Sequence, residues 1–341
     1  MSFCRGKSVP RQGIERRNRT MIQKEAAPEV TWLGFKIVNV YLVGKKGGPW
    51  VVVDTSTPGH FESIRAAAEE VYGPGAKPEA ILLTHAHRDH CGSALALATY
   101  WNVPIYAPKL DLPYLTGQAL PPGDATTDGF LALATRFLPR SGTNLGEFVR
   151  ALPDDGSVPG LPDWRWLPTP GHTPGHVSLF RESDRTLIAG DAVVTVNSDS
   201  LADMVTQAQE LSRPPTSVTY DWVAARRSVE ELAKLRPKVI ASGHGVPMAG
   251  ETLAADLAEF AQDFTAPKHG RYVAEPARFD EKGVAFLPPA PPDYRAGAMA
   301  GIAAAALIGL GIYALTRRKD SDNSDGGSIT SGPMRIEDLE G

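Results

Sequence analysis

Short apolar runs alternate with helical patterns between residues 30 and 265 of this 341-residue chain. Residues 37–43 and 50–53 are mainly apolar and flank a Lys-Lys-Gly-Gly turn, a pattern typical of a β-hairpin. Residues 61–72 place apolar side chains at helical spacing. Further strands are predicted at 80–83, 164–167, 177–180, 186–189 and 238–241, and further helices at 93–100 and 221–235. This alternation predicts an α/β (α+β) domain.

One long stretch inside this domain lacks the alternation. Residues 109–160 are rich in Pro and Gly, and they carry Tyr114, Phe130, Phe137 and Phe148 with little strand pattern. Long irregular segments of this kind are often substrate loops or lids. The same aromatic residues are equally compatible with a satellite core, and the sequence leaves both interpretations open.

The C-terminal region has the pattern of a membrane anchor. Residues 296–315 contain no charged residue and are bounded by Arg295 and Arg317. At 1.5 Å per residue, such a helix spans roughly 30 Å, the thickness of one bilayer core. A Pro-rich linker at 268–295 precedes it, and a polar tail at 316–341, expected to be disordered, follows it. The sequence therefore predicts one C-terminal transmembrane helix, with a buried Ala/Gly-rich helix as the alternative.

The N-terminal residues 1–29 are basic and contain no apolar stretch of a secretory signal. We expect a disordered arm, and the sequence leaves open whether translation starts at Met1 or Met21. A large domain without a signal is expected to remain cytoplasmic beside a single-pass membrane anchor. The formal net charge of -4 gives no electrostatic footprint for nucleic acid. Two cysteines are too few for a disulfide framework.

Four potential metal ligands stand directly after the predicted strand at 80–83: His85, His87, Asp89 and His90. In an extended segment, residues two apart point the same way, so His85 and His87 can converge on one ion. The turn that follows can then direct Asp89 and His90 at a second ion. This cluster predicts a metal site at the end of the strand.

Three further candidate ligands also follow predicted strands. His172 lies in a Thr-Pro-Gly-His-Thr-Pro-Gly-His loop, Asp191 follows Gly190, and His244 lies between two glycines. We expect all of these strand ends to meet at one edge. Imidazole and carboxylate ligands suit zinc, with iron or manganese as substitutes. His176 is a candidate partner that orients the ligands, whereas His60 and His269 are expected at the surface.

The ordered motifs HxHxDH, TPGHTPGH, GD and GH resemble the metallo-β-lactamase-fold hydrolase superfamily over about residues 30 to 250. The resemblance implies an αββα sandwich of two mixed β-sheets flanked by helices, for a catalytic domain at 30–267. It also implies two Zn2+ ions and an order of ligands: His85, His87 and His172 for the first ion, Asp89, His90 and His244 for the second, Asp191 as the bridge, and Asp54 as support.

Two ions about 3.5–4 Å apart can share a hydroxide that is nucleophilic at neutral pH. We expect this metal-bound hydroxide to cleave a thioester, lactone or ester, with Asp89 and Asp191 as catalytic residues that orient it and pass on its proton. His90 resembles glyoxalase II-like and lactonase-like members. Val194 stands where the lactonases carry a Tyr, and Tyr220 is a candidate replacement. The sequence does not assign substrate-binding residues.

Alternative functions remain open. A persulfide dioxygenase-like enzyme uses the same fold with one iron, and a non-catalytic membrane-anchored scaffold retains the fold without turnover. A nuclease is disfavoured, because the chain lacks the length and the basic charge for a nucleic-acid-binding domain. The expected partners are a small-molecule substrate and, through the C-terminal helix, a membrane, without nucleic acid. A homodimer is left open.

Overall fold

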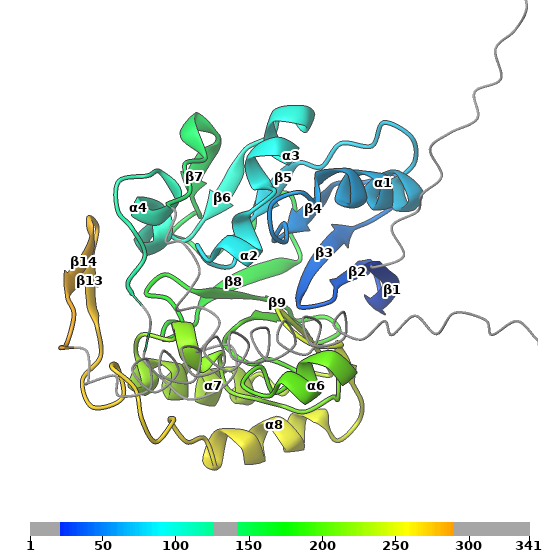
Figure 1. Ribbon diagram of the computed structural model, residues 1–341. Helices are drawn as coiled ribbons and strands as arrows, with labels where there is room; N and C mark the ends of the chain where they lie inside the picture. Colours follow the sequence, from blue (N-terminus) through cyan, green and yellow to red (C-terminus); the bar gives the residue numbers. More distant parts are fainter. Residues whose placement is uncertain (1–20, 124, 126–141, 290–341) are drawn as a thin grey trace, which may run out of the picture. The chain divides into compact units, whose positions relative to one another are not determined.

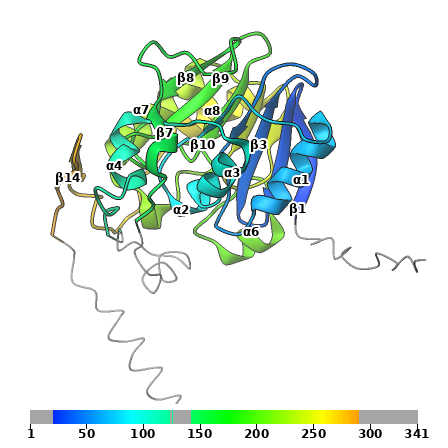
Figure 2. The ribbon, with the colours of Figure 1, turned by 90° about the horizontal axis from the view of Figure 1, so that it is seen from above.

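The computed structural model describes residues 21–123, 125 and 142–289. These residues form two mixed β-sheets packed face to face, with helices against the outer face of each sheet (Figures 1 and 2). The α/β sandwich expected from the sequence is therefore confirmed.

The first sheet has seven strands in the order β1-β2-β3-β4-β5-β6-β7. Its first four strands pair antiparallel, and the pairs from β4 to β7 are parallel. The strands are β1 Met21–Ala27, β2 Val30–Phe35, β3 Val38–Gly44, β4 Trp50–Val53, β5 Ala80–Leu82, β6 Ile105–Ala107 and β7 Val149–Ala151.

The second sheet has five strands in the order β12-β11-β10-β9-β8, and its β10–β11 pair is parallel. The strands are β8 Trp164–Pro168, β9 Val177–Arg181, β10 Thr186–Gly190, β11 Val239–Ser242 and β12 Met248–Ala249. A separate hairpin consists of β13 Arg278–Asp280 and β14 Gly283–Phe286.

The helices fall into two sets along the chain. In the first half lie α1 Phe61–Tyr72, α2 Arg88–Cys91, α3 Ala94–Trp101, α4 Leu112–Leu115 and the 3-10 turns η1 Lys109–Asp111 and η2 Gly146–Phe148. In the second half lie α6 Leu201–Thr206, η3 Thr216–Val218, α7 Trp222–Lys234 and α8 Leu253–Gln262. Helices α1 and α3 cover the first sheet, and α7 and α8 cover the second.

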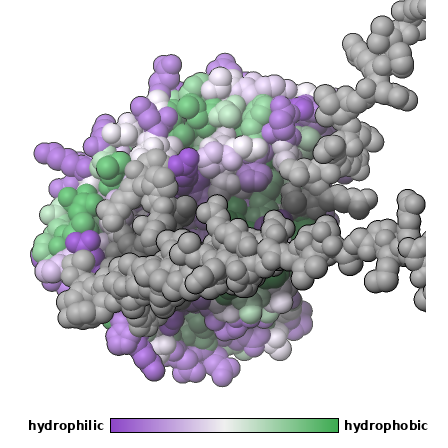
Figure 3. Space-filling view, viewed as in Figure 1, coloured by the Kyte–Doolittle hydropathy of each residue, from purple (hydrophilic) through white to green (hydrophobic). Residues whose placement is uncertain are grey.

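The period-two alternation of the strands explains this layering. Along β4, Trp50 and Val52 pack beneath α1 and α3, whereas Val51 and Val53 face the second sheet. Both faces of the central strands are buried, so the apolar runs are continuous rather than alternating with polar residues. On the face seen in Figure 3, hydrophilic and hydrophobic residues are interspersed over the described part of the chain.

The N-terminal arm expected at 1–29 needs a correction, because residues 21–27 form the edge strand β1. Six register pairs join it to β2, from Met21↔Phe35 to Ala27↔Val30. Only Ala27 of this strand is fully buried, so its polar, solvent-facing residues give little apolar signal. Residues 1–20 lie outside the described part of the chain.

The expected substrate loop at 109–160 and linker at 268–295 also contain ordered structure. The first includes β7, which pairs with β6 in the large sheet. The second includes the β13–β14 hairpin, and its Tyr272 and Ala277 are buried against Tyr220. These short elements carry too few apolar residues to show a period. Residues 124, 126–141 and 290–341 lie outside the described part of the chain.

Within the described ranges, no helix is long and apolar enough to cross a bilayer. The transmembrane helix expected at 296–315 lies outside those ranges, so it stays a prediction.

Candidate metal centre

Four strand ends bring the candidate ligands together. His85 and His87 follow β5, His172 lies in the β8–β9 loop, Asp191 follows β10 and His244 follows β11. The β8–β9 loop is tied to the end of β5, because the N–H of Val177 donates to the carbonyl oxygen of Thr84 at 3.0 Å. One edge of the sandwich therefore collects residues that are far apart in the sequence.

The collected side chains form three overlapping groups, in each of which the potential ligand atoms lie within 4.8 Å of one another. These groups are His85, His87 and His172; His85, His90 and Asp191; and Asp89, His90 and His244. Below, "first group" means His85, His87 and His172, and "second group" means Asp89, His90 and His244. The structure thus brings together all seven residues that the sequence suggested as ligands.

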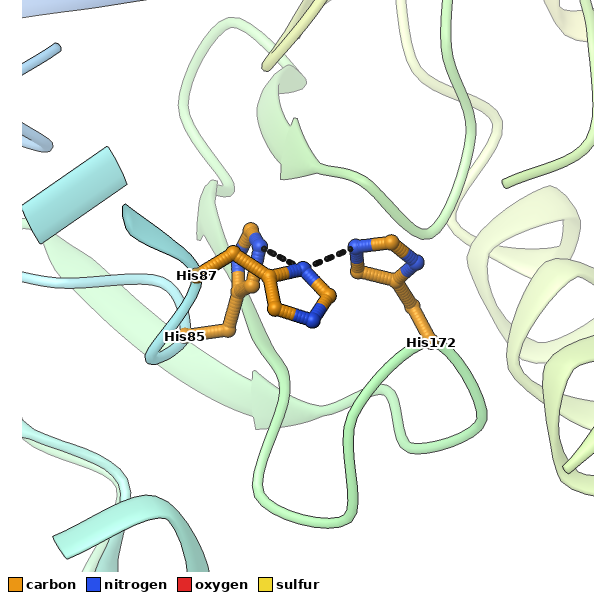
Figure 4. A group of neighbouring side chains, drawn as sticks. All are labelled: His85, His87 and His172. Atoms are coloured by element: carbon orange, nitrogen blue, oxygen red, sulfur yellow. Dashed lines mark hydrogen bonds between the residues drawn. The ribbon is translucent and has the colours of Figure 1, made fainter. Parts of the chain in front are cut away.

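In the first group, the three imidazoles point at one another across the gap between the two loops (Figure 4). Nδ1 of His87 lies 3.1 Å from Nε2 of His85 and 2.9 Å from Nε2 of His172. Three ring nitrogens converge on one small volume, which is the arrangement that a metal ion requires from histidine ligands.

Hydrogen bonds on the outer side of this group determine which nitrogen faces inward. The hydroxyl of Thr84 donates to Asp54, so it accepts from Nδ1 of His85 at 3.0 Å. The hydroxyl of Thr219 donates to the carbonyl of Pro215, so it accepts from Nδ1 of His172 at 3.0 Å. Each histidine therefore turns an unprotonated Nε2 toward the centre.

His87 is oriented the other way round. Its Nδ1 faces the centre, and its Nε2 lies 3.3 Å from the hydroxyl of Tyr220. Tyr220 lies two residues before α7 and next to Asp221, whose side chain accepts from the first N–H groups of that helix. The candidate replacement tyrosine thus lies beside the metal centre. Tyr272 and Phe279 pack against its ring.

The second group has outer partners of a different kind. Nδ1 of His90 donates to a carboxylate oxygen of Asp54 at 2.8 Å. Nδ1 of His244 donates to the backbone carbonyl of Ile37, in the turn between β2 and β3. The inner Nε2 atoms of these two histidines lie 3.7 Å and 3.6 Å from Oδ2 of Asp89.

Asp191 lies between the two groups. Its Oδ2 is 3.2 Å from Nε2 of His172 and 3.1 Å from Nε2 of His244. The same oxygen is 3.6 Å from Nε2 of His90 and 4.0 Å from Nε2 of His85. One carboxylate oxygen therefore contacts ligands of both groups, as a bridging ligand would.

The backbone around Asp191 is tightly held. Its N–H donates to Nε2 of His176 at 2.9 Å, and Nδ1 of His176 in turn faces the Thr169 hydroxyl at 2.8 Å. A Cβ atom at Gly243 would lie 2.0 Å from Oδ1 of Asp191, so only glycine fits there. His176 positions the Asp191 backbone from outside the cluster.

The surroundings keep two histidines of the first group, His85 and His87, neutral. Burial and the neighbouring imidazoles lower the pKa of His85 and that of His87 well below the ordinary value. Burial likewise lowers the pKa of His176 to about 3. Since neutral imidazole is the form that binds metals, His85 and His87 are ready to bind an ion without losing protons.

The second group has the opposite electrostatic balance. Burial alone would lower the pKa of His90, but the carboxylates of Asp191, Asp89 and Asp54 raise it well above the ordinary value. Burial also opposes protonation of His244, yet Asp191 and Asp89 raise its pKa. Burial would raise the pKa of Asp191, but the two imidazoles lower it well below its ordinary value.

The buried polar atoms at the centre of the cluster are consistent with bound metal ions. Nε2 of His90 and Oδ1 of Asp191 are buried, and neither has a hydrogen-bond partner among the described residues. Burying such polar atoms is costly unless something satisfies them. All five histidines of the cluster, by contrast, have a partner on their outer nitrogen. Cations at the centre would satisfy the inner atoms.

The remaining candidates take different positions. Asp54 accepts from the N–H and hydroxyl of Thr84 as well as from His90, so it links the two groups from behind. His60 bonds Thr57 in another loop, and His269 is exposed. Sequence reasoning missed Thr84 and Thr219 as partners, since a hydroxyl next to a motif carries no signal of its own.

The comparisons with known proteins agree with this geometry. The metallo-beta-lactamase superfamily model matches residues 33–244. The probable metallo-hydrolase YflN of Bacillus subtilis strain 168 is 41% identical over 241 residues, covering 70% of this chain and 91% of that protein. The probable metallo-hydrolase YybB of the same organism is 29% identical over 201 residues, covering 59% of this chain and 78% of that protein.

A solved structure shares the fold. The subclass B3 metallo-beta-lactamase BJP-1 of Bradyrhizobium japonicum aligns with a TM-score of 0.50 at 18% identity, covering 71% of this chain and 89% of that one. The family model and the relative YflN confirm the resemblance predicted from the HxHxDH, TPGHTPGH, GD and GH motifs.

Proposed function

The chain belongs to the metallo-beta-lactamase superfamily, and from this premise we propose that it hydrolyses a thioester, lactone or ester of a small molecule at a centre of two metal ions. The first group and Asp191 would hold one ion, and the second group and Asp191 would hold the other. We propose zinc for both, because imidazole and carboxylate ligands without thiolate suit it, with iron or manganese as substitutes.

One observation carries the proposal. Every histidine of the cluster has a hydrogen-bonded outer nitrogen, while its other nitrogen faces the shared centre. Hydrogen bonds of this kind fix the tautomer and ring orientation of histidines that bind metals. Five independent side chains arranged in this way are difficult to explain as ordinary buried histidines.

The approach to the centre is from the side of His87 and Asp89, which are partly exposed, whereas His85 and His90 are fully buried. Two bound ions would supply a nucleophile from water at neutral pH and would polarise a carbonyl oxygen. The carboxylate of Asp89, whose side chain is 33% exposed, would orient that water and accept its proton. Asp191 lies deeper, between the two groups, and would orient the water from its inner side.

The carbonyl class of substrate is the finer part of the proposal. A seven-ligand cluster with a histidine at position 90 supports the glyoxalase II-like and lactonase-like branch, and the proximity of Tyr220 to His87 supports it further. The relatives YflN and YybB are described as probable metallo-hydrolases, which supports hydrolysis but specifies no bond.

Metal analysis and a substrate panel test the proposal on the purified full chain. We expect two zinc ions per chain and turnover of at least one thioester, lactone or carboxylic ester, with phosphodiesters as the control class. One iron per chain with oxygen-dependent oxidation of a persulfide would replace this function by a dioxygenase. No bound metal and no turnover would leave a non-catalytic scaffold.

A further inference from the structure

Asp111 is a fully buried carboxylate that none of the sequence motifs contains. It ends the η1 turn after β6, in the segment Lys109-Leu110-Asp111. Both of its oxygens are used. Oδ2 accepts from the N–H of Ala86 and from the hydroxyl of Thr173, each at 2.8 Å, and Oδ1 accepts from the N–H of Gly175 at 2.8 Å.

These three donors belong to the two loops that carry the first group. Ala86 lies between His85 and His87, and Thr173 directly follows His172. These are the two segments that approach each other in Figure 4, where His85 and His87 come from one loop and His172 from the other. A single side chain thus connects the two loops outside the metal centre.

The contact leaves no room for adjustment on the Gly175 side. A Cβ atom at Gly175 would lie 2.7 Å from Oδ1 of Asp111 and 2.9 Å from its backbone nitrogen. The loop therefore approaches the carboxylate as closely as a glycine permits. The same loop continues to His176, whose Nε2 accepts from the N–H of Asp191 at 2.9 Å.

The three groups around Asp111 all donate, so only the ionised carboxylate accepts from all of them. Burial raises the pKa of Asp111 to about 6, but the bonds from Thr173, Gly175 and Ala86 act in the opposite direction. A buried charge that is held only by donors from the two metal-bearing loops is poorly explained as general core packing.

We propose that Asp111 is a positioning residue that sets the distance between the His85–His87 loop and the His172 loop, and through it the affinity of the first group for its metal. The inference rests on the proposed function, because it requires that the first group binds an ion. Asp111 does not touch the ion or the substrate. It acts through Ala86 and Thr173.

The decisive measurement is metal affinity rather than activity. In a full-length His244→Ala background the second group is incomplete, so a titration with Zn2+ against a competing chelator reports the first group. We expect Asp111→Asn to weaken Zn2+ binding, by no more than the about 10- to 100-fold that follows the loss of a direct outer partner of a metal ligand. An asparagine has one oxygen, so at least one of the two loop N–H donors would face its NH2 group.

A matched control is available at Asp184, a carboxylate that also accepts three hydrogen bonds, from Arg181 and Thr186, in the β9–β10 turn. Asp184→Asn should leave the affinity of the first group unchanged. Equal affinities in Asp111→Asn and Asp184→Asn, with both chains folded by circular dichroism, would overturn the inference.

A second pair keeps the test decisive if Asp111→Asn fails to fold. Thr173→Ser retains the hydroxyl that Asp111 accepts from, and Thr173→Val removes it at nearly the same volume. We expect tighter Zn2+ binding by the serine variant, and equal binding by the two would refute the inference. If the unaltered chain binds no metal, the proposed function fails. If the unaltered chain binds two ions, and neither Asp111→Asn nor Thr173→Val weakens Zn2+ binding, the proposed function stands and only the role of Asp111 fails.

Discussion

The two groups of the metal centre share Asp191 but are supported in different ways. In the first group the outer nitrogens contact the hydroxyls of Thr84, Thr219 and Tyr220. In the second group they contact the carboxylate of Asp54 and the carbonyl of Ile37. Neutral hydroxyls thus surround one group, and stronger acceptors surround the other.

The difference in support coincides with a difference in charge. The pKa of His85 is lowered by burial, whereas the pKa of His90 is raised by three nearby carboxylates that outweigh burial. His85 is therefore held neutral, whereas His90 lies close to the carboxylates of Asp191, Asp89 and Asp54. Two ions bound in this centre would therefore have different electrostatic surroundings, although the same edge of the sandwich supplies the ligands of both.

The largest effect is expected from Asp191→Ala, because one oxygen of this residue lies within 4.0 Å of ligands of both groups. Both ions lose a ligand, so the fall in turnover should exceed the about 10- to 100-fold typical of outer partners. His87→Ala should also abolish turnover while the domain stays folded. His269→Ala, at an exposed position, is the matched control. Steady-state kinetics and circular dichroism check both, and full activity in Asp191→Ala would contradict the two-ion site.

The next effect is expected from Asp54→Asn, which keeps the shape of the side chain. Asp54 accepts from His90 and from two groups of Thr84, so the substitution disturbs the supports of both groups. We expect metal affinity to fall by about 10- to 100-fold, more for the second ion than for the first. Stepwise titration with Zn2+ measures both constants. Weaker binding of the first ion alone would contradict the prediction that Asp54 supports the second group more strongly than the first.

Acid should release the two ions in sequence. The pKa values of His90 and His244 are raised, so these ligands take up protons first as the pH falls. The pKa values of His85 and His87 are lowered, so these two ligands of the first group stay neutral to lower pH. Because protons compete with metals for imidazole, the second ion should leave at the higher pH. Dialysis at stepped pH with metal analysis shows whether the ions are released in one stage or in two. Release in a single stage would contradict the predicted difference between the two groups.

The ligands could be predicted from the sequence because each motif is local. His85, His87, Asp89 and His90 follow one strand directly, and period-two geometry gives their directions. The strand that carries them was also predictable, since both of its faces are buried and its apolar run is uninterrupted.

The supports of the ligands could not be predicted in the same way. The carbonyl of Ile37 and the hydroxyl of Thr219 contact histidines 207 and 47 residues away, and neither residue type signals such a contact. Asp111 is likewise an ordinary acidic residue until the fold brings two loops around it. Strand β1 escaped prediction for a different reason, because an edge strand with one buried residue has no apolar period.

The smallest effect is expected from Thr219→Val, which removes one neutral acceptor from the first group. The hydroxyl accepts from Nδ1 of His172 at 3.0 Å, and its loss frees the imidazole to rotate or to exchange its tautomer. A neutral hydrogen bond contributes about 0.5–1.5 kcal/mol, so affinity for the first ion should fall by no more than about tenfold. Thr219→Ser, which keeps the hydroxyl, should restore it. A loss for Thr219→Val as large as that for Asp54→Asn would mean that hydroxyl and carboxylate supports are equivalent, and that charge does not distinguish the two groups.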